Sequence, residues 1–299
     1  MIYKKLAIIL FSLCILLFSL SGCASAAASA EEYYSIGMAY FELGRYEEAE
    51  KWLNRARQAD RTMIASTYNL GRLAYEQKRY EEATRHFESI LRIDADNVLA
   101  LKAAAYSRIM MRDFPSAEKH YTRLFELVPE SADSGYNHAL VLHALGRHAE
   151  AQIVLERYPS SLLENKDNLL LYARIQAAQN KVEAINSFTS YLSENSNPLA
   201  RYEYAQVLEH HQFFARALEE FRKALSETPA ASLNPKRSDI RFSIARILLT
   251  ADNNSEGIAE LQTAVNDGFN DRAAVERLLT RVSAAHREPV RNILSSMRN

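Results

Sequence analysis

The order of apolar and polar positions divides the chain into an N-terminal apolar stretch and a long body in which similar segments recur. Residues 6–20 are mostly apolar. After them, the segments "GMAYFELGRYEEAEKWL" (37–53) and "GRLAYEQKRYEEATRHF" (71–87) place apolar, glycine and charged residues in nearly the same order, 34 residues apart. A fixed period of this length indicates an array of similar structural units.

The period continues through most of the body. One alanine recurs in each unit, in steps of 34 and later 33 residues, at Ala49, Ala83, Ala117, Ala151, Ala184 and Ala217. A last unit follows the insertion "SLNPKR" and has Gly257 in the alanine position. The pattern predicts seven units, spanning about residues 30–63, 64–97, 98–131, 132–164, 165–197, 198–231 and 238–271.

Composition favours helix throughout these units. The 299 residues include only eight Gly and seven Pro, and they are rich in the strong helix formers Ala, Leu, Glu and Arg. No convincing run of alternating β-branched residues indicates a strand. A second recurring position holds small residues, namely Gly37, Gly71, Ala105, Ala139, Ala205 and Ala245. Small side chains at both recurring positions predict two closely packed helices in each unit.

The units resemble the tetratricopeptide repeat, whose pattern is W-x2-L-G-x2-Y, then A-x3-F, then P. The first unit has "YYSIGMAY" (33–40) followed by "AEKWL" (49–53), and the second has Leu70-Gly71 followed by "ATRHF" (83–87). The resemblance covers about residues 30–271. It implies an all-α fold, a right-handed α-solenoid of about seven helix-turn-helix repeats in which neighbours stack into one continuous core.

Residues 272–299 are predicted to form one or two capping helices at the end of the solenoid. Two apolar faces are expected, one made by Ala274, Leu278, Leu279 and Val282 and the other by Val290, Ile293, Leu294 and Met297. The charged outer face, which is rich in arginine, suits a solenoid cap. The same arginines could instead contact acidic lipid or a partner protein.

The first 23 residues have the parts of a bacterial secretion signal. Lys4 and Lys5 give a positively charged start, and small residues lead to Cys23. The apolar stretch between them has about 15 residues, whereas a bilayer-spanning helix needs about 20. The ending "LSGC" (20–23) resembles the lipobox of bacterial lipoproteins.

The lipobox resemblance implies that residues 1–22 are a lipoprotein signal peptide that is removed. Cys23 would then carry a diacylglyceryl group, often with a further acyl chain such as palmitate on its amino group. Residues 23–29 would form a lipidated tether to a membrane of the bacterial cell envelope, in the outer membrane or on the periplasmic face. Two alternatives are ordinary secretory cleavage near "ASAAASA" (24–30) and an uncleaved membrane anchor.

Composition and motif content argue against several function classes. The net charge of -1 does not indicate the basic surface that nucleic-acid-binding proteins usually have. The only cysteines, Cys14 and Cys23, precede the body, so neither a disulfide nor a cysteine zinc site is expected within it. The chain has no Walker A, G-x-S-x-G, G-x-G-x-x-G or H-E-x-x-H motif. We therefore expect no catalytic residues, no metal and no cofactor.

Aromatic residues recur at the fifth position of each unit, which lines the concave surface in tetratricopeptide proteins. These positions hold Tyr34, Tyr68, Lys102, Tyr136, Leu169, Tyr202 and Phe242. Neighbouring positions of the same surface add Met38, Arg72, Tyr75, Tyr106 and Arg246. Together they predict an aromatic groove with positive charge, suited to an extended peptide or an amphipathic helix. Alternatively, the tyrosines only pack between repeats, or the C-terminal helix of the chain fills the groove.

The resemblance and the groove together favour a non-catalytic scaffold or adaptor that binds a peptide or a partner protein. Tyr34 and Met38 occupy positions where chaperone-binding repeats use the polar residues of a carboxylate clamp, so a chaperone C-terminus is not expected as the ligand. The alternative function is an accessory module that binds a small or apolar ligand and works with an envelope transporter.

Overall fold

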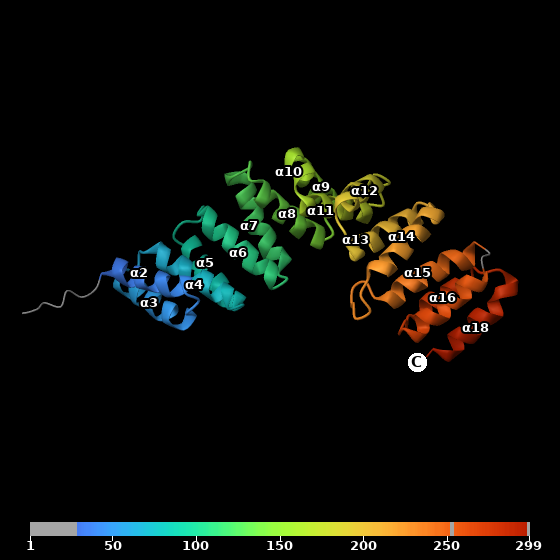
Figure 1. Ribbon diagram of the computed structural model, residues 1–299. Helices are drawn as coiled ribbons and strands as arrows, with labels where there is room; N and C mark the ends of the chain where they lie inside the picture. Colours follow the sequence, from blue (N-terminus) through green and yellow to red (C-terminus); the bar gives the residue numbers. More distant parts are fainter. Residues whose placement is uncertain (1–28, 252–253, 298–299) are drawn as a thin grey trace, which may run out of the picture. The chain divides into compact units, whose positions relative to one another are not determined.

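A computed structural model describes residues 29–251 and 254–297 of the chain. All regular structure in these residues is helical, and they contain no β-strand (Figure 1). None of their helices is long and apolar enough to cross a membrane. The predicted signal peptide, the predicted lipid site at Cys23 and all of the predicted tether except Ser29 lie outside the described residues.

The helices follow one another as pairs joined by short turns, as the all-α prediction requires. The first helices of the pairs are α2 (Ala30–Glu42), α4 (Ile64–Glu76), α6 (Val98–Met110), α8 (Ala132–Ala144), α11 (Lys166–Ala178), α13 (Pro198–His210) and α15 (Arg237–Thr250). The second helices are α3 (Tyr46–Ala59), α5 (Tyr80–Leu91), α7 (Phe114–Leu127), α9 (His148–Glu156), α12 (Ala184–Glu194), α14 (Phe214–Glu227) and α16 (Asn254–Asn266). Each first helix begins within one residue of the repeat start expected from the sequence.

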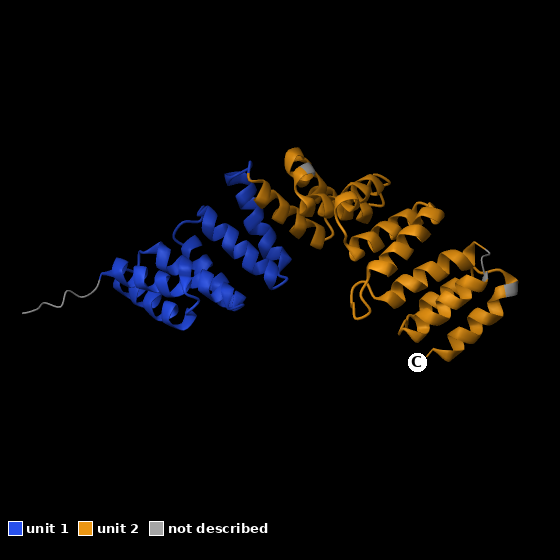
Figure 2. Ribbon diagram, viewed as in Figure 1, with its two compact units in different colours: residues 1–130 blue, residues 131–299 orange. Residues whose placement is uncertain are grey.

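The chain divides into two compact units (Figure 2). Unit 1 comprises residues 1–130, of which the described part holds the first three helix pairs. Unit 2 comprises residues 131–299 and holds the remaining four pairs and the C-terminal helices.

The two recurring small positions are buried in every pair where the sequence predicted them. The six alanines of the second helices and the four alanines of the first helices are all fully buried. At the glycine positions the helices come closer still, because a Cβ on Gly71 would lie 2.6 Å from Cε1 of Phe87. The predicted close packing of the two helices is therefore confirmed.

One backbone feature recurs in the turn inside each pair. The second residue after the first helix has a positive φ in six of the turns, at Gly44, Lys78, Arg112, Gly146, Asn180 and Gln212. A left-handed residue at this position lets the chain reverse while satisfying the last helical carbonyls. Most of these positions are not glycine, which explains why the sequence pattern did not reveal them.

The fourth pair departs from the expected regularity. Its second helix, α9, has only nine residues, and a short helix α10 (Pro159–Glu164) follows it. Pro159 lies in the first turn of α10, where the missing N–H is tolerated. Inside a continuous helix it would remove a backbone hydrogen bond and interrupt the helix. The predicted 132–164 repeat therefore contains three helices.

The C-terminal residues form the predicted cap. They fold into α17 (Arg272–Leu279), the 3₁₀ turn η1 (Ala284–His286) and α18 (Arg287–Ser296). Val275 and Leu278 of α17 join Val290, Ile293 and Leu294 of α18 in one buried cluster with side chains of α15 and α16. Because α18 packs against α16, this helix closes the end of the last pair.

Candidate functional site

The first helices of unit 1 carry seven of the predicted groove residues. Helix α2 contributes Tyr34 and Met38, α4 contributes Tyr68, Arg72 and Tyr75, and α6 contributes Lys102 and Tyr106. Arg72 and Tyr106 are exposed, and the other five are half-buried. We call the surface formed by these seven residues the unit 1 groove face.

A buried asparagine links α2 to α4 on this face. Asn69 is 5% exposed, and its Nδ2 donates to Tyr34 Oη at 3.0 Å. Arg72 Nη1 in turn donates to Asn69 Oδ1 at 2.9 Å, and its guanidinium lies 5.0 Å from the centre of the Phe41 ring. Asn69 was not predicted as a site residue, although a polar residue on a helix face that must be buried is a usable signal.

Two tyrosines meet where α4 lies beside α6. The ring centres of Tyr75 and Tyr106 are 5.6 Å apart, and Tyr80 lies 5.2 Å from Tyr75 on its other side. Burial raises the pKa of Tyr75 well above its usual range, and the neighbouring Tyr106 raises it further. The Tyr75 hydroxyl therefore stays neutral at physiological pH.

A small cleft lies beside these rings. It has a volume of about 150 Å³ and is lined by Arg72, Tyr75, Glu76, Phe87, Ala103 and Tyr106. Within the described part of the chain, Arg72 forms no ion pair with a carboxylate, so its charge is available to a group that enters the cleft. Its volume suits one or two side chains, since pockets for drug-sized ligands measure about 300–1,000 Å³.

Exposed apolar residues continue the cleft along α6. Leu99 is 62% exposed, Tyr106 46% and Met110 43%. Spacings of seven and four residues place them on one side of the helix. The sequence pattern did not indicate Leu99, which lies three residues before the fifth position of its repeat.

The remaining predicted groove residues lie in unit 2, and most are occupied by internal contacts. Tyr136 is half-buried on α8, and the half-buried Tyr202 has its ring 5.6 Å from that of Phe221. Phe242 is 5% exposed and stacks on Phe269 at 4.2 Å, so it belongs to the core of the last pair.

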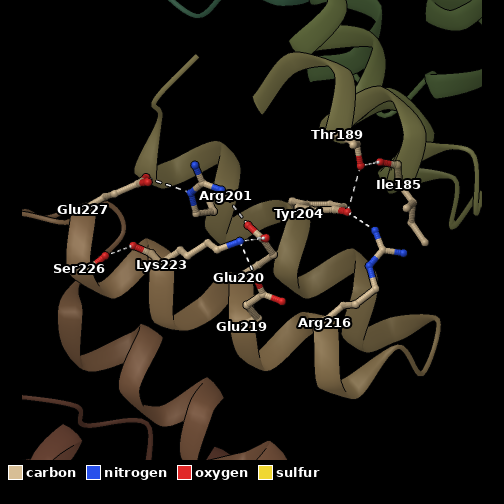
Figure 3. Close-up of polar contacts among 10 residues, drawn as sticks. All are labelled: Ile185, Thr189, Arg201, Tyr204, Arg216, Glu219, Glu220, Lys223, Ser226 and Glu227. Carbon is tan, nitrogen blue, oxygen red and sulfur yellow. Dashed lines mark hydrogen bonds and ion pairs between the residues drawn. The ribbon is translucent and has the colours of Figure 1, made fainter. Parts of the chain in front are cut away.

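Arginines in unit 2 are held by carboxylates of the same unit. Arg246 binds Glu209 through two hydrogen bonds of 2.8 and 2.6 Å. Figure 3 shows Arg201 of α13 between Glu220 and Glu227 of α14, at 2.8 and 3.0 Å. The same triad recurs 40 residues later, where Arg241 contacts Glu260 at 2.8 Å and Asp267 at 3.1 Å.

Polar contacts also tie α12 to α13 and α14. Tyr204 is 5% exposed, and its hydroxyl lies 3.0 Å from Thr189 Oγ1 and accepts from Arg216 Nη2 at 2.6 Å (Figure 3). Buried polar groups that satisfy one another in this way fix the geometry of a core. These contacts position helices, and they leave the unit 1 groove face as the better candidate for a partner.

Unit 2 has its own cleft, of about 400 Å³. Its lining includes His143, Arg174, Glu203, His210 and His211. Arg174 Nε donates to Glu203 at 2.8 Å, so the strongest charges in the cleft compensate one another. No cluster of three or more His, Cys, Asp or Glu suited to a metal ion occurs in residues 29–251 and 254–297.

Half-buried histidines are expected to make the stability of the chain depend on pH. Burial lowers the pKa of His86, His120 and His143, and for His143 the neighbouring His148 lowers it further. Because each folded-state pKa lies below the unfolded value of about 6.5, the unfolded chain binds more protons as the pH falls through this value. We therefore expect the free energy of unfolding to decrease on acidification from about pH 7.5 to about pH 5.5.

Urea unfolding at the two pH values measures this effect. The variant that combines His86→Gln, His120→Gln and His143→Gln should lose less stability between them than the native chain does. An equal loss in both proteins would show that other groups cause the pH dependence.

Comparison with known proteins agrees with this architecture. Family models described as tetratricopeptide repeat match residues 26–96, 102–162 and 173–235, which together make up more than half of the chain. No curated protein has a significant sequence match.

Solved structures share the fold at low sequence identity. A tetratricopeptide repeat protein from Parabacteroides merdae superimposes with a TM-score of 0.59 and 19% identity, over 84% of this chain and 97% of that one. YrrB, described as a TPR protein with an unusual peptide-binding site, gives a TM-score of 0.53 and 15% identity, over 64% of this chain and 96% of that one. MamA gives a TM-score of 0.52 and 18% identity, over 55% of this chain and 90% of that one.

Proposed function

The chain belongs to the tetratricopeptide repeat family, and we propose that it is a lipid-anchored, non-catalytic scaffold of the bacterial cell envelope. In this proposal the unit 1 groove face binds a peptide segment of a partner protein. The observation that carries the proposal is the cleft beside Tyr75 and Tyr106, which joins exposed apolar surface to the available charge of Arg72.

The chemistry of this face suits a peptide. Tyrosine offers a large apolar area together with a hydroxyl group, and it loses little conformational entropy on binding. An apolar side chain of the partner would enter the cleft, while a carbonyl or carboxylate would accept hydrogen bonds from Arg72. Solenoid proteins present such extended surfaces for partners, and YrrB is one protein of this fold with a peptide-binding site.

The volume of the cleft favours a peptide over a whole small-molecule ligand. About 150 Å³ accommodates part of a partner but is below the usual range of ligand pockets. The larger cleft of unit 2 is lined mainly by polar and charged side chains, of which Arg174 and Glu203 already pair.

The anchor in this proposal is Cys23, at the end of the lipobox-like "LSGC" (20–23). Two or more acyl chains give stable membrane attachment, whereas one gives marginal binding. A tether of residues 23–29 reaches at most about 25 Å when extended. The partner segment would therefore be found at or near the same membrane.

Affinity capture from cells that produce the full chain tests both parts of the proposal. The native chain should incorporate labelled palmitate, fractionate with membranes and recover a specific partner after crosslinking. Cys23→Ser should abolish labelling and release the chain from the membrane, while the purified variant still binds the recovered partner. An unlabelled native chain would contradict the anchor, and the absence of any specific partner would contradict the scaffold.

A further inference from the structure

Aromatic residues cover the outer side of the first helix pair. Tyr33 of α2 lies against Trp52 of α3, with ring centres 5.7 Å apart. Arg55 lies over the Trp52 ring at 4.5 Å, and on the same side of α2 Ile36 is 37% exposed. Tyr40 follows one turn later, and Arg45 lies over its ring at 4.7 Å. We call Tyr33, Ile36 and Trp52 the N-terminal end face.

The next repeats show what this side of a first helix normally contacts. Ile36 corresponds to Leu70, 34 residues later, and Tyr40 corresponds to Ala74. Leu70 is 3% exposed because it packs in one cluster with Ala49 and Leu53 of the preceding pair, whereas Ala74 packs with Phe87 of its own pair and Ala104 of the next. No helix pair precedes α2 in the described residues, so Ile36, the counterpart of Leu70, remains 37% exposed.

The chemistry of the N-terminal end face differs from that of an ordinary solenoid end. Terminal repeats usually present a polar outer surface that keeps the array soluble. This end instead combines tyrosine and tryptophan with arginine. Tyrosine and tryptophan concentrate at the boundary between lipid and water, and arginine extends its charged group to the headgroups while its stem covers apolar surface.

We infer that the N-terminal end face lies on the surface of the phospholipid bilayer that holds the Cys23 lipid. This inference rests on the lipid anchor proposed above. Helix α2 begins at Ala30, seven residues after Cys23, so the tether keeps the first helix pair within about 25 Å of the membrane. Because the lipid would already hold the chain at the membrane, the N-terminal end face would meet the bilayer at a high effective concentration, and a weak contact would be sufficient.

Two of the nearby carboxylates have partners within the first helix pair. Glu32 accepts from the backbone of Ser29 at 2.7 Å in a capping box, and Glu48 accepts from Arg45 Nε at 3.0 Å. Because Glu31, Glu42 and Glu47 are also exposed on these helices, the attraction must come from aromatic insertion at the headgroup level and not from net charge.

Trp52 provides a direct reporter, since it is the only tryptophan of the chain. The purified lipidated full chain is reconstituted into vesicles of phosphatidylethanolamine and phosphatidylglycerol, with or without brominated acyl chains. We expect brominated lipid to quench most of the Trp52 emission. The matched control combines Trp52→Phe with Phe213→Trp, which moves the indole to a site in unit 2 that is 44% exposed, and we expect its emission to be little quenched.

Flotation of the same vesicles separates the inference from the anchor. A chain that floats but shows no quenching at position 52, or equal quenching at both positions, overturns the inference and leaves the anchor intact. A chain that does not float overturns both. Unquenched emission together with a concentration-dependent dimer in detergent would show that a second copy covers the face, which also overturns the inference.

Discussion

Phe87→Ala is expected to lower the free energy of unfolding by about 3–5 kcal/mol, the usual cost of deleting a buried phenylalanine. Phe87 is 1% exposed and packs against Tyr68, and its ring fills the space that Gly71 leaves open. Alanine at position 87 would leave a cavity inside the second helix pair. Urea unfolding followed by circular dichroism measures the change.

Phe213→Ala is the matched control, because Phe213 is 44% exposed in a turn. Its cost should stay within about 0.5 kcal/mol, as for most surface substitutions. Similar losses for the two variants would contradict the assignment of Phe87 to the core. Because repeats stabilise their neighbours, the Phe87 variant should also loosen the adjoining pairs of unit 1.

The combined substitutions Arg72→Ala and Tyr106→Ala are expected to weaken binding of the captured partner by about 100-fold or more. Arginine and tyrosine are frequent hot-spot residues, and losing such a residue typically costs about 2 kcal/mol or more, while tenfold corresponds to about 1.4 kcal/mol. Both side chains are exposed, so their removal should leave the fold intact. Fluorescence anisotropy with the partner segment measures the affinity.

Ile93→Ala serves as the control for this pair. Ile93 is 73% exposed but lies outside the cleft lining, in the turn after α5. Its affinity should equal that of the native chain. A double variant that binds as well as the native chain would exclude the cleft as the site of contact.

The repeat architecture could be predicted because its signal is periodic. Most units have small residues at the same two positions, so Gly71 and Ala83 together indicate where two helices cross. Burial of both confirms the prediction. The break at Pro159 was not foreseen, because the period continues on both sides of it and only the local chemistry of proline ends α9.

The groove was less predictable, because one position of a repeat can face different surroundings along the solenoid. Tyr34 and Phe242 share the fifth position, yet Phe242 stacks on Phe269, which follows α16 in the sequence. Likewise, Arg72 forms no ion pair within the described residues, whereas Arg246 pairs with Glu209, which lies 37 residues earlier. Such contacts depend on side chains from other helices. A comparison of equivalent positions in the repeats therefore does not reveal them.

The most direct measurement for the central claim is photocrosslinking in cells with a benzoylphenylalanine at position 106 of the membrane-bound full chain. We expect a specific crosslink to one partner segment from position 106 and none from position 93, which is more exposed to solvent. Loss of the crosslink in the Arg72→Ala background would link it to the cleft. The absence of any crosslink at position 106, with a partner captured instead from position 93, would contradict binding at the unit 1 groove face.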